Sequence, residues 1–305
     1  MAQSSNVDRP VWADHGTMPF QLVLEGGAMR SLFTCGAVDF LLDRGVVAES
    51  VIGTSAGAIC GYNYVAGATG RMAYFSMEYR SDWRFMSMRS KLLTGNYVGS
   101  EYIFDTLPNK VEPLDQSWFT KSPAKLVSVA TDMERGCADY HDYDDEHDLQ
   151  RGMRYMVGGA SVPFANRAVD VDGKRLLDGG VADVVPFRRD HREYAGRQVV
   201  ILTRPRGFRQ KTTSEWVIDR ARYARYPRFA ELLGTRFERN NAARRAVERL
   251  HDDGGVFAIW PKEEIVAGTA ERDTDKLFAA YIDGVRTMAE QWPALREYLG
   301  IDGKD

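Results

Sequence analysis

The first third of the chain repeats one local pattern: a short apolar run, a stretch of small residues, and then a helical pattern. Residues 20–24 are an apolar run that ends in glycines, and apolar side chains then recur at helical spacing over residues 32–41. The pattern repeats at residues 51–52, which lead through a glycine into a small-residue segment at 56–66. A helix between two strands lets them pair in parallel. The sequence therefore predicts an α/β fold with a central, mostly parallel sheet.

Three later segments add strands to this sheet. Residues 125–130 and 198–203 are further apolar runs of strand length. Residues 169–177 predict a hairpin, because Asp172 and Gly173 form the dipeptide that favours a tight turn between two strands.

The chain changes character after these strands. Residues 204–249 hold thirteen Lys and Arg residues against five Asp and Glu residues, with helical patterning from about residue 215. Residues 255–260 predict one more short strand, and residues 273–291 predict a final amphipathic helix. The last hundred residues are therefore expected to be mainly helical.

The composition fits a soluble globular protein, with 44% hydrophobic and 27% charged residues. We expect a flexible tail at residues 1–16, where the sequence is polar and unpatterned. We further expect one main domain at residues 17–205 and a C-terminal extension at residues 206–305 that packs on it. A chain of 305 residues is long enough to bury the core that this requires.

The same totals bear on the protein's surroundings. No run approaches the roughly 18 apolar residues of a membrane span, and residues 1–19 lack the apolar segment of a signal peptide. Three cysteines without metal-type spacing argue for a reducing compartment. We therefore expect a cytoplasmic protein, with peripheral contact at a membrane left open. A net charge of −3 gives no overall attraction to nucleic acid, and no motif predicts a metal or cofactor.

A G-x-S-x-G pentapeptide centred on Ser55 joins the second strand to its helix. Gly53 and Gly57 permit a tight turn, and the helix start stabilises negative charge near the serine hydroxyl. This is the strand–turn–helix context that a nucleophilic serine requires. The alternative is an ordinary tight turn with a capping serine.

A glycine-rich loop with backbone N–H groups suited to an oxyanion joins the first strand to its helix. A phosphate of a nucleotide is the weaker alternative, because the loop is neither G-x-G-x-x-G nor a P-loop. The candidate residues of this loop are Gly26, Gly27, Ala28, Met29 and Arg30.

Asp178 follows the hairpin strand and precedes two glycines, Gly179 and Gly180. Two residues without side chains leave a carboxylate unobstructed toward a cleft. A plain turn explains the tripeptide equally well when it is taken alone.

Together, and in this order, the three motifs resemble the patatin-like phospholipase family. That family combines a Gly-Gly-Gly-x-Arg loop, a G-x-S-x-G serine and a late Asp-Gly-Gly in a Ser–Asp dyad without histidine. Residues 160–164 resemble the family segment that leads to the aspartate. The likeness covers about residues 20–205 and is strongest to bacterial members, whose Leu-Glu-Gly-Gly-Gly-Met-Arg and Thr-Arg-Pro segments correspond to residues 24–30 and 203–205.

The resemblance implies a three-layer α/β/α sandwich and a serine lipid-acyl hydrolase of phospholipase A or esterase type, acting on a lipid or ester substrate. Ser55 would be the nucleophile, Asp178 its base, and the glycine-rich loop the oxyanion site. Ala28 and Ser31 depart from the family pattern, which has glycine at both positions. If residue 28 takes a positive φ, alanine costs about 1 kcal/mol there.

Two alternatives remain open. A Ser–Asp–His triad would use His191 or His251, which follow the aspartate in the chain. A non-catalytic binding protein would keep the scaffold for a lipid or protein partner, and the departures at Ala28 and Ser31 leave room for it.

For four other features we weigh a structural interpretation against a functional one. Residues 139–148 hold six carboxylates and two histidines, and a solvated loop is favoured over a cation site. The basic residues after 204 are expected on a solvated helical face, although they suit anionic head groups or nucleic acid. Residues 71–98, rich in methionine and aromatic side chains, predict either core packing or a mobile cap over an acyl-chain pocket. Cys35 and Cys60 are expected to be buried and inert.

Overall fold

Eight strands form one sheet in the computed structural model, which describes residues 9–143, 148–188, 196–211, 221–268 and 270–301. The strands are β1 (Met18–Leu24), β2 (Ala48–Thr54), β3 (Lys125–Asp132), β4 (Cys137–Asp142), β5 (Val169–Val171), β6 (Lys174–Asp178), β7 (Arg197–Ile201) and β8 (Phe257–Ile259). The order across the sheet is β5-β6-β3-β2-β1-β7-β8, and β4 pairs with β3 beside this path.

The middle of the sheet is parallel and one end is antiparallel. β3, β2, β1, β7 and β8 pair in parallel, whereas β4 and β6 run antiparallel to β3 and β5 runs antiparallel to β6. Leu24 of β1 pairs with Gly53 of β2 and Ile201 of β7, so these strands end together. The loops that follow β1 and β2 therefore meet at one edge of the sheet.

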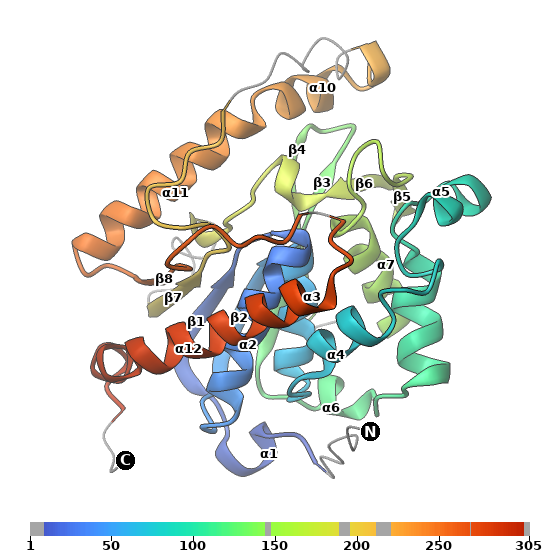
Figure 1. The fold of residues 1–305 in the computed structure, drawn as a ribbon. Coiled ribbons are helices and arrows are strands. Elements are labelled where there is room, and N and C mark those ends of the chain that lie inside the picture. Colours follow the sequence, from blue (N-terminus) through green and yellow to red (C-terminus); the bar gives the residue numbers. More distant parts are fainter. Residues whose placement is uncertain (1–8, 144–147, 189–195, 212–220, 269, 302–305) are drawn as a thin grey trace.

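Helices surround the sheet, as Figure 1 shows. They are α1 (Trp12–His15), η1 (Ala28–Arg30), α2 (Ser31–Leu42), α3 (Ala56–Val65), α4 (Arg71–Glu78), α5 (Met88–Thr94), η2 (Tyr102–Val111), α6 (Ser117–Thr120), α7 (Leu149–Gly159), η3 (Gly179–Val181), α10 (Pro227–Gly234), α11 (Arg236–Asp252) and α12 (Thr274–Leu299). No helix in the described residues is long and apolar enough to cross a membrane.

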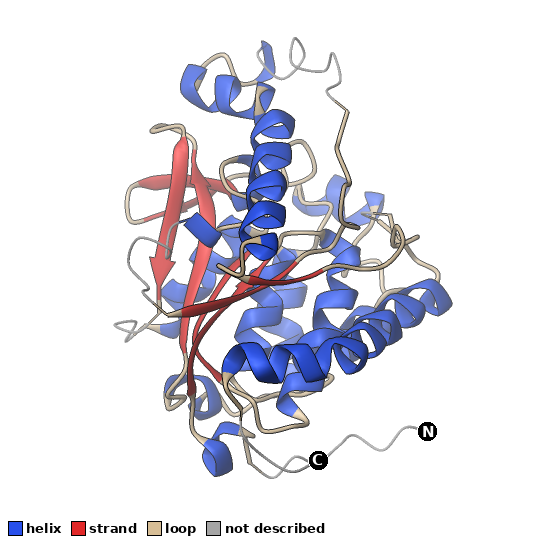
Figure 2. Ribbon diagram, turned by 90° about the vertical axis from the view of Figure 1, so that its left-hand side faces the viewer, coloured by secondary structure: helices blue, strands red, loops and turns tan. Residues whose placement is uncertain are grey.

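The two faces of the sheet bury different sets of side chains because successive residues of a strand point to opposite faces. Leu22 and Leu24 of β1 pack with apolar residues of α2, α3 and α12. Val23 lies between them in β1 and packs on the other face, in a cluster that includes Ala246 and Val247 of α11. Figure 2 shows the sheet with helices on both sides. The predicted mostly parallel α/β fold with C-terminal helices is confirmed.

The last helix contacts the first long helix through backbone. A Cβ atom on Gly36 of α2 would lie 2.0 Å from the carbonyl oxygen of Tyr281, and one on Gly284 of α12 would lie 2.0 Å from that of Phe33. Only glycine permits so close a crossing. The contact attaches α12, which belongs to the predicted C-terminal extension, to α2 beside the sheet. The division of the chain at residue 205 stays a proposal.

Two expectations about secondary structure differ from the structure. The acidic segment at 139–148 is not a loop throughout, because residues up to Asp142 form β4. Asp139 is 6% exposed and its Oδ2 accepts a hydrogen bond from Lys174 Nζ at 2.6 Å. Its charge is paired within the fold, which lets an acidic segment join the sheet. The final helix also runs to Leu299, through Pro293, because Leu295 and Leu299 are buried in the core.

The structure describes the predicted tail only from residue 9 onward, and it describes both of the cysteines predicted to lie on helices. Residues 1–8 lie outside the described residues, and Trp12 in α1 donates a hydrogen bond from Nε1 to the carbonyl oxygen of Trp118. Cys35 and Cys60 are buried, with their Sγ atoms 3.4 Å apart. The flexibility of the tail and the inertness of the thiols stay predictions.

Candidate active site

Ser55 lies on a strained turn between β2 and α3. Its φ and ψ angles are 54° and −126°, a region that residues with a Cβ rarely occupy. The flanking glycines make the turn possible: a Cβ on Gly53 would lie 2.6 Å from the backbone nitrogen of Ala58, and one on Gly57 would lie 2.6 Å from the carbonyl oxygen of Leu24. The turn holds the serine at the edge where β1 and β2 end.

Asp178 lies against this serine, 123 positions away in the chain. Ser55 Oγ donates a hydrogen bond to Asp178 Oδ2 at 2.6 Å, and the backbone N–H of Gly180 donates to Asp178 Oδ1 at 2.7 Å. Gly179 packs directly on β3, since a Cβ there would lie 2.3 Å from the carbonyl oxygen of Val129. Both carboxylate oxygens therefore have defined partners.

Burial changes the acidity of this carboxyl group. It raises the pKa of Asp178 from its ordinary value of 3.8 to about 6, although the hydrogen bonds from Ser55 and Gly180 act in the opposite direction. A carboxylate with a pKa near 6 is a better proton acceptor than an exposed one, and it is still ionised at neutral pH.

The glycine-rich loop offers fewer donors than its sequence suggests. The N–H of Gly26 donates to Val184 O at 3.1 Å, and the N–H of Arg30 donates to Gly27 O at 3.1 Å. The N–H groups of Gly27, Ala28 and Met29 have no hydrogen-bond acceptor among the described residues. Of the five loop residues predicted to form the oxyanion site, these three therefore keep an N–H group for a substrate oxygen. That role stays a prediction.

Ala28 takes the conformation that makes its departure from the family pattern costly. Its φ is 49°, in the left-handed region that favours glycine. Gly27 needs glycine for another reason, because a Cβ there would lie 2.7 Å from Thr203 Oγ1. The loop thus keeps its shape with one strained alanine.

A buried ion pair adjoins the glycine-rich loop and was not predicted from the sequence. Glu25 is fully buried, and its Oε1 lies 2.7 Å from Nη2 and 2.9 Å from Nε of Arg244 in α11. Its Oε2 accepts hydrogen bonds from the backbone and side chain of Thr203. The residue before the glycines is therefore fixed by the C-terminal extension, and the basic composition after residue 204 was the one available signal.

Arg30 lies near two arginine–glutamate pairs. Burial and the neighbouring Arg204 lower the pKa of its guanidinium to about 10. Arg204 is paired with Glu264, and Arg244 with Glu25. Arg30 forms no ion pair with any described residue, and its buried Nε has no hydrogen-bond partner.

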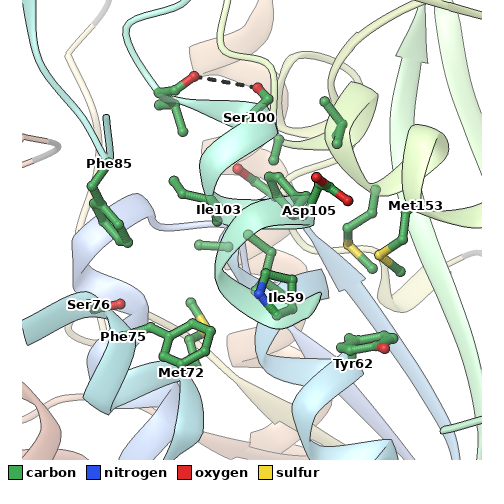
Figure 3. A pocket seen from close by; sticks show the side chains of 18 of the residues that line it. Ile59, Tyr62, Met72, Phe75, Ser76, Phe85, Ser100, Ile103, Asp105 and Met153 are labelled. Carbon is green, nitrogen blue, oxygen red and sulfur yellow. Dashed lines mark hydrogen bonds between the residues drawn. The ribbon is translucent and has the colours of Figure 1, made fainter. Parts of the chain in front are cut away.

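A cavity of about 630 Å³ opens beside Ser55 and is lined mainly by apolar side chains. Figure 3 shows them converging from α3, α4, η2 and α7; they include Ile59, Tyr62, Met72, Phe75, Ile103 and Met153. Phe85 and Met86 also line it, so part of the methionine-rich segment at 71–98 borders a cavity. Mobility of that segment stays a prediction.

A second cavity of about 230 Å³ also borders Ser55 and Asp178. Its wall includes the loop residues Gly26 to Ala28 and, from the C-terminal extension, Arg236 and Asn240. This cavity was not predicted from the sequence, because the loop residues and Arg236, which border it from two sides, lie about two hundred positions apart in the chain.

Of the two histidines of the alternative triad, only His251 lies in the described part of the chain. His191 lies outside the described residues. His251 accepts a hydrogen bond at Nδ1 from the N–H of Ala258 and packs against Phe257 and Trp260, away from both cavities. In the described residues no group of His, Cys, Asp or Glu side chains has the arrangement of a metal site.

The fold and site define an α/β protein in which a serine on a strained strand-to-helix turn lies against a buried carboxylate. A family model described as patatin-like phospholipase matches residues 22–190, which is more than half of the chain. The chain belongs to the patatin-like phospholipase family. A second model, a domain of unknown function (DUF6363), matches residues 226–300.

Several curated proteins resemble the chain. The uncharacterized protein YjjU of Escherichia coli is 26% identical over 197 residues, which cover 61% of this chain and 54% of that protein. An uncharacterized NTE family protein of Mycobacterium tuberculosis is 25% identical over 54% of this chain and 44% of its own length. The lysophospholipase NTE1 of Candida glabrata is 26% identical over 54% of this chain and 9% of its own length. The chain thus spans about half the length of the bacterial relatives that it matches.

Among solved structures, VipD from Legionella pneumophila aligns with 91% of this chain and 67% of its own, at 10% identity and a TM-score of 0.44.

Proposed function

We propose that the protein is a lipid-acyl hydrolase that cleaves carboxylic esters through a Ser55–Asp178 dyad. The observation that carries the proposal is the 2.6 Å hydrogen bond from Ser55 Oγ to a buried carboxylate, beside a large apolar cavity. The family supports lipid hydrolysis at a general level, and relatives named lysophospholipases support a lipid ester as substrate. The apolar cavity suits an acyl chain.

In the proposed reaction Asp178 Oδ2 takes the proton of Ser55 Oγ while Oγ bonds to the ester carbonyl carbon. The N–H groups of Gly27, Ala28 and Met29 stabilise the negative charge on the former carbonyl oxygen. The bond to the alcohol then breaks, and the alcohol leaves with the proton from Asp178. Water repeats the sequence on the acyl-enzyme, which releases the fatty acid and returns the proton to Ser55.

The dyad is tested by hydrolysis of p-nitrophenyl butyrate and palmitate by wild type, Ser55→Ala and Asp178→Asn. Both variants are expected to fall to background, and Ser55→Ala is expected to lose labelling by a fluorophosphonate probe. Ser81→Ala and Asp253→Asn change exposed residues of the same types and serve as matched controls. Activity that survives Ser55→Ala, or a wild type inert on all esters, would remove the catalytic proposal and leave the binding-protein alternative.

We also propose that α5 brings the site to a membrane surface. Met88, Leu92 and Leu93 on this short helix are 63%, 82% and 66% exposed. The segments on either side of α5 line the large cavity, through residues 85–86 and 97–98. Exposed leucines beside basic Arg89 suit the surface of an anionic bilayer.

This contact is tested by sedimentation with vesicles of phosphatidylcholine and phosphatidylglycerol. Replacing Leu92 and Leu93 by serine is expected to reduce the bound fraction several-fold. Val266→Ser removes an apolar side chain that is 74% exposed outside α5 and serves as the control. Equal binding by the double variant and the control would refute the α5 contact.

A further inference from the structure

Thr54 directly precedes the proposed nucleophile and contacts the loop that follows the proposed base. Its Oγ1 donates a hydrogen bond of 2.8 Å to the carbonyl oxygen of Asp183, 129 positions later in the chain. We propose that Thr54 and Asp183 are positioning residues, which hold the serine turn against the loop that carries the base. They thereby set the distance between the two members of the dyad. The inference rests on the proposed ester hydrolysis and adds two residues to it, neither of which lines a cavity at Ser55.

The loop from Asp178 to Asp183 is a single hydrogen-bonded turn. The backbone N–H of Asp183 donates to Gly179 O at 2.8 Å, directly after the base. Asp178 is also held at its own backbone, because its N–H donates to Ser161 O and its carbonyl oxygen accepts from Thr131 Oγ1, each at 2.8 Å. The base therefore has a fixed position, and the contact of Thr54 with the end of this turn relates the serine to that position.

The side chain of Asp183 is a carboxyl group that the proposed proton transfer does not use. The hydroxyl group of Tyr140 in β4 donates to Asp183 Oδ2 at 2.9 Å. Burial raises the pKa of this carboxyl group to about 6, so it is ionised at neutral pH and the hydrogen bond is charge-assisted. Arg239 of α11 donates to the carbonyl oxygen of Val181, two residues earlier. The loop is thus fixed to the sheet by one contact and to the C-terminal extension by the other.

The next residue links the same loop to the glycine-rich loop. Val184 O accepts a hydrogen bond of 3.1 Å from the N–H of Gly26. Thr54 packs on this glycine as well, since a Cβ on Gly26 would lie 3.2 Å from Thr54 Cγ2. The consecutive carbonyl groups of Asp183 and Val184 therefore hold the turn with the nucleophile and the loop with the proposed oxyanion donors.

The contact of Thr54 bears on the reaction because the dyad works over a short distance. Ser55 Oγ lies 2.6 Å from Asp178 Oδ2, and proton transfer requires that the two atoms stay within hydrogen-bond reach. Thr54 has no exposed surface, so water can replace its hydroxyl group only if the two loops move apart. A misplacement of about 1 Å can lower a catalytic rate about 100-fold.

The test compares Thr54→Val, which keeps the shape of the side chain and removes the donor, with Thr54→Ser, which keeps the hydroxyl group. The measured quantities are kcat and KM for p-nitrophenyl butyrate and the rate of labelling by a fluorophosphonate probe. We expect Thr54→Val to lower kcat at least about tenfold with little change in KM, because the dyad is displaced and the cavities are not. Labelling should slow in parallel, and Thr54→Ser should restore most of both rates.

Tyr64→Phe separates positioning from stability. The hydroxyl group of Tyr64 is buried and donates to Val46 O at 2.8 Å, like the contact of Thr54, but it lies at the opposite end of β2 from Ser55. Both Tyr64→Phe and Thr54→Val are expected to lower Tm, and only Thr54→Val is expected to lower kcat. Rates are measured well below either Tm and are expressed per serine that the probe labels at completion.

Tyr140→Phe tests the support of Asp183 from the sheet. We expect it to lower kcat by a smaller factor than Thr54→Val, and the loss in the double variant to be less than the product of the two, because both changes act on one contact. An unchanged kcat in Thr54→Val, an equal loss in Tyr64→Phe, or a Thr54→Ser variant as slow as Thr54→Val would each overturn the positioning role. A wild type inert on all esters would instead refute the ester hydrolysis itself.

Discussion

The buried pair of Glu25 and Arg244 makes the stability of the protein depend on a contact between residues 219 positions apart in the chain. We predict that Arg244→Met destabilises the fold by about 3–5 kcal/mol, the usual cost of leaving one buried charge without its partner. Glu25 has no exposed surface and the side chain of Arg244 is 7% exposed, so water cannot replace the lost partner. A loss of this size is a large part of the roughly 5–15 kcal/mol that stabilises a typical protein.

The double variant Glu25→Gln with Arg244→Met tests whether the unpaired charge of Glu25 causes the destabilisation. Gln keeps an acceptor for Thr203 and removes the uncompensated charge, so the double variant is expected to be more stable than Arg244→Met by at least about 1 kcal/mol. The free energy of unfolding is measured by urea titration with tryptophan fluorescence. Arg245→Met, exposed on the same helix, should change it by less than about 0.5 kcal/mol. Additive losses in the double variant would refute the reasoning, as would a cost below about 1 kcal/mol for Arg244→Met.

Four more predictions concern three single residues. Because the carboxylate form of Asp178 is the proposed base and its pKa is about 6, kcat/KM for a neutral ester should fall about tenfold per pH unit below pH 6; an acid limb near pH 4 would contradict this. The same raised pKa makes Asp178 progressively destabilising as pH rises from 3.8 to about 6, so Asp178→Asn should flatten the dependence of urea stability on pH in that window. Ala28→Gly should raise the unfolding free energy by up to about 1 kcal/mol with activity retained, because it relieves a φ of 49°; a loss of stability would count against strain at this position. Gly284→Ala should lower thermal stability by about 2 kcal/mol or more, since its Cβ would meet Phe33 O, whereas Gly268→Ala meets nothing within 4 Å and should be neutral.

The local units of the fold could be predicted because their signals lie within short stretches of sequence. Apolar runs followed by small residues marked β1 and β2, which extend from Met18 to Leu24 and from Ala48 to Thr54. The hairpin of β5 and β6 was confirmed, with Asp172 and Gly173 at φ angles of 51° and 72° in its turn. Turn chemistry of this kind depends on neighbouring residues alone.

The parts that could not be predicted depend on residues far apart in the chain. An acidic segment was expected to be a loop, yet Asp139 lies in a strand because Lys174 pairs with it from β6. Basic residues were expected on a solvated face, yet Arg244 is buried against Glu25, 219 positions away. Composition gives the charge of a segment but not its partner. For the same reason the sequence placed Ser55 and Asp178 in one site only through the family resemblance.

The position of β1 has a consequence for synthesis of the chain on the ribosome. β1 is made first among the strands but lies inside the sheet, where Gln21 pairs with Ser50 on one side and Gln198 on the other. The second partner lies 177 positions later in the chain, and synthesis of that length takes roughly 10–35 s at ordinary elongation rates. During that interval a nascent chain presents one open edge of an apolar strand. Chaperones that shield such edges should therefore matter most before β7 emerges, however stable the finished protein is.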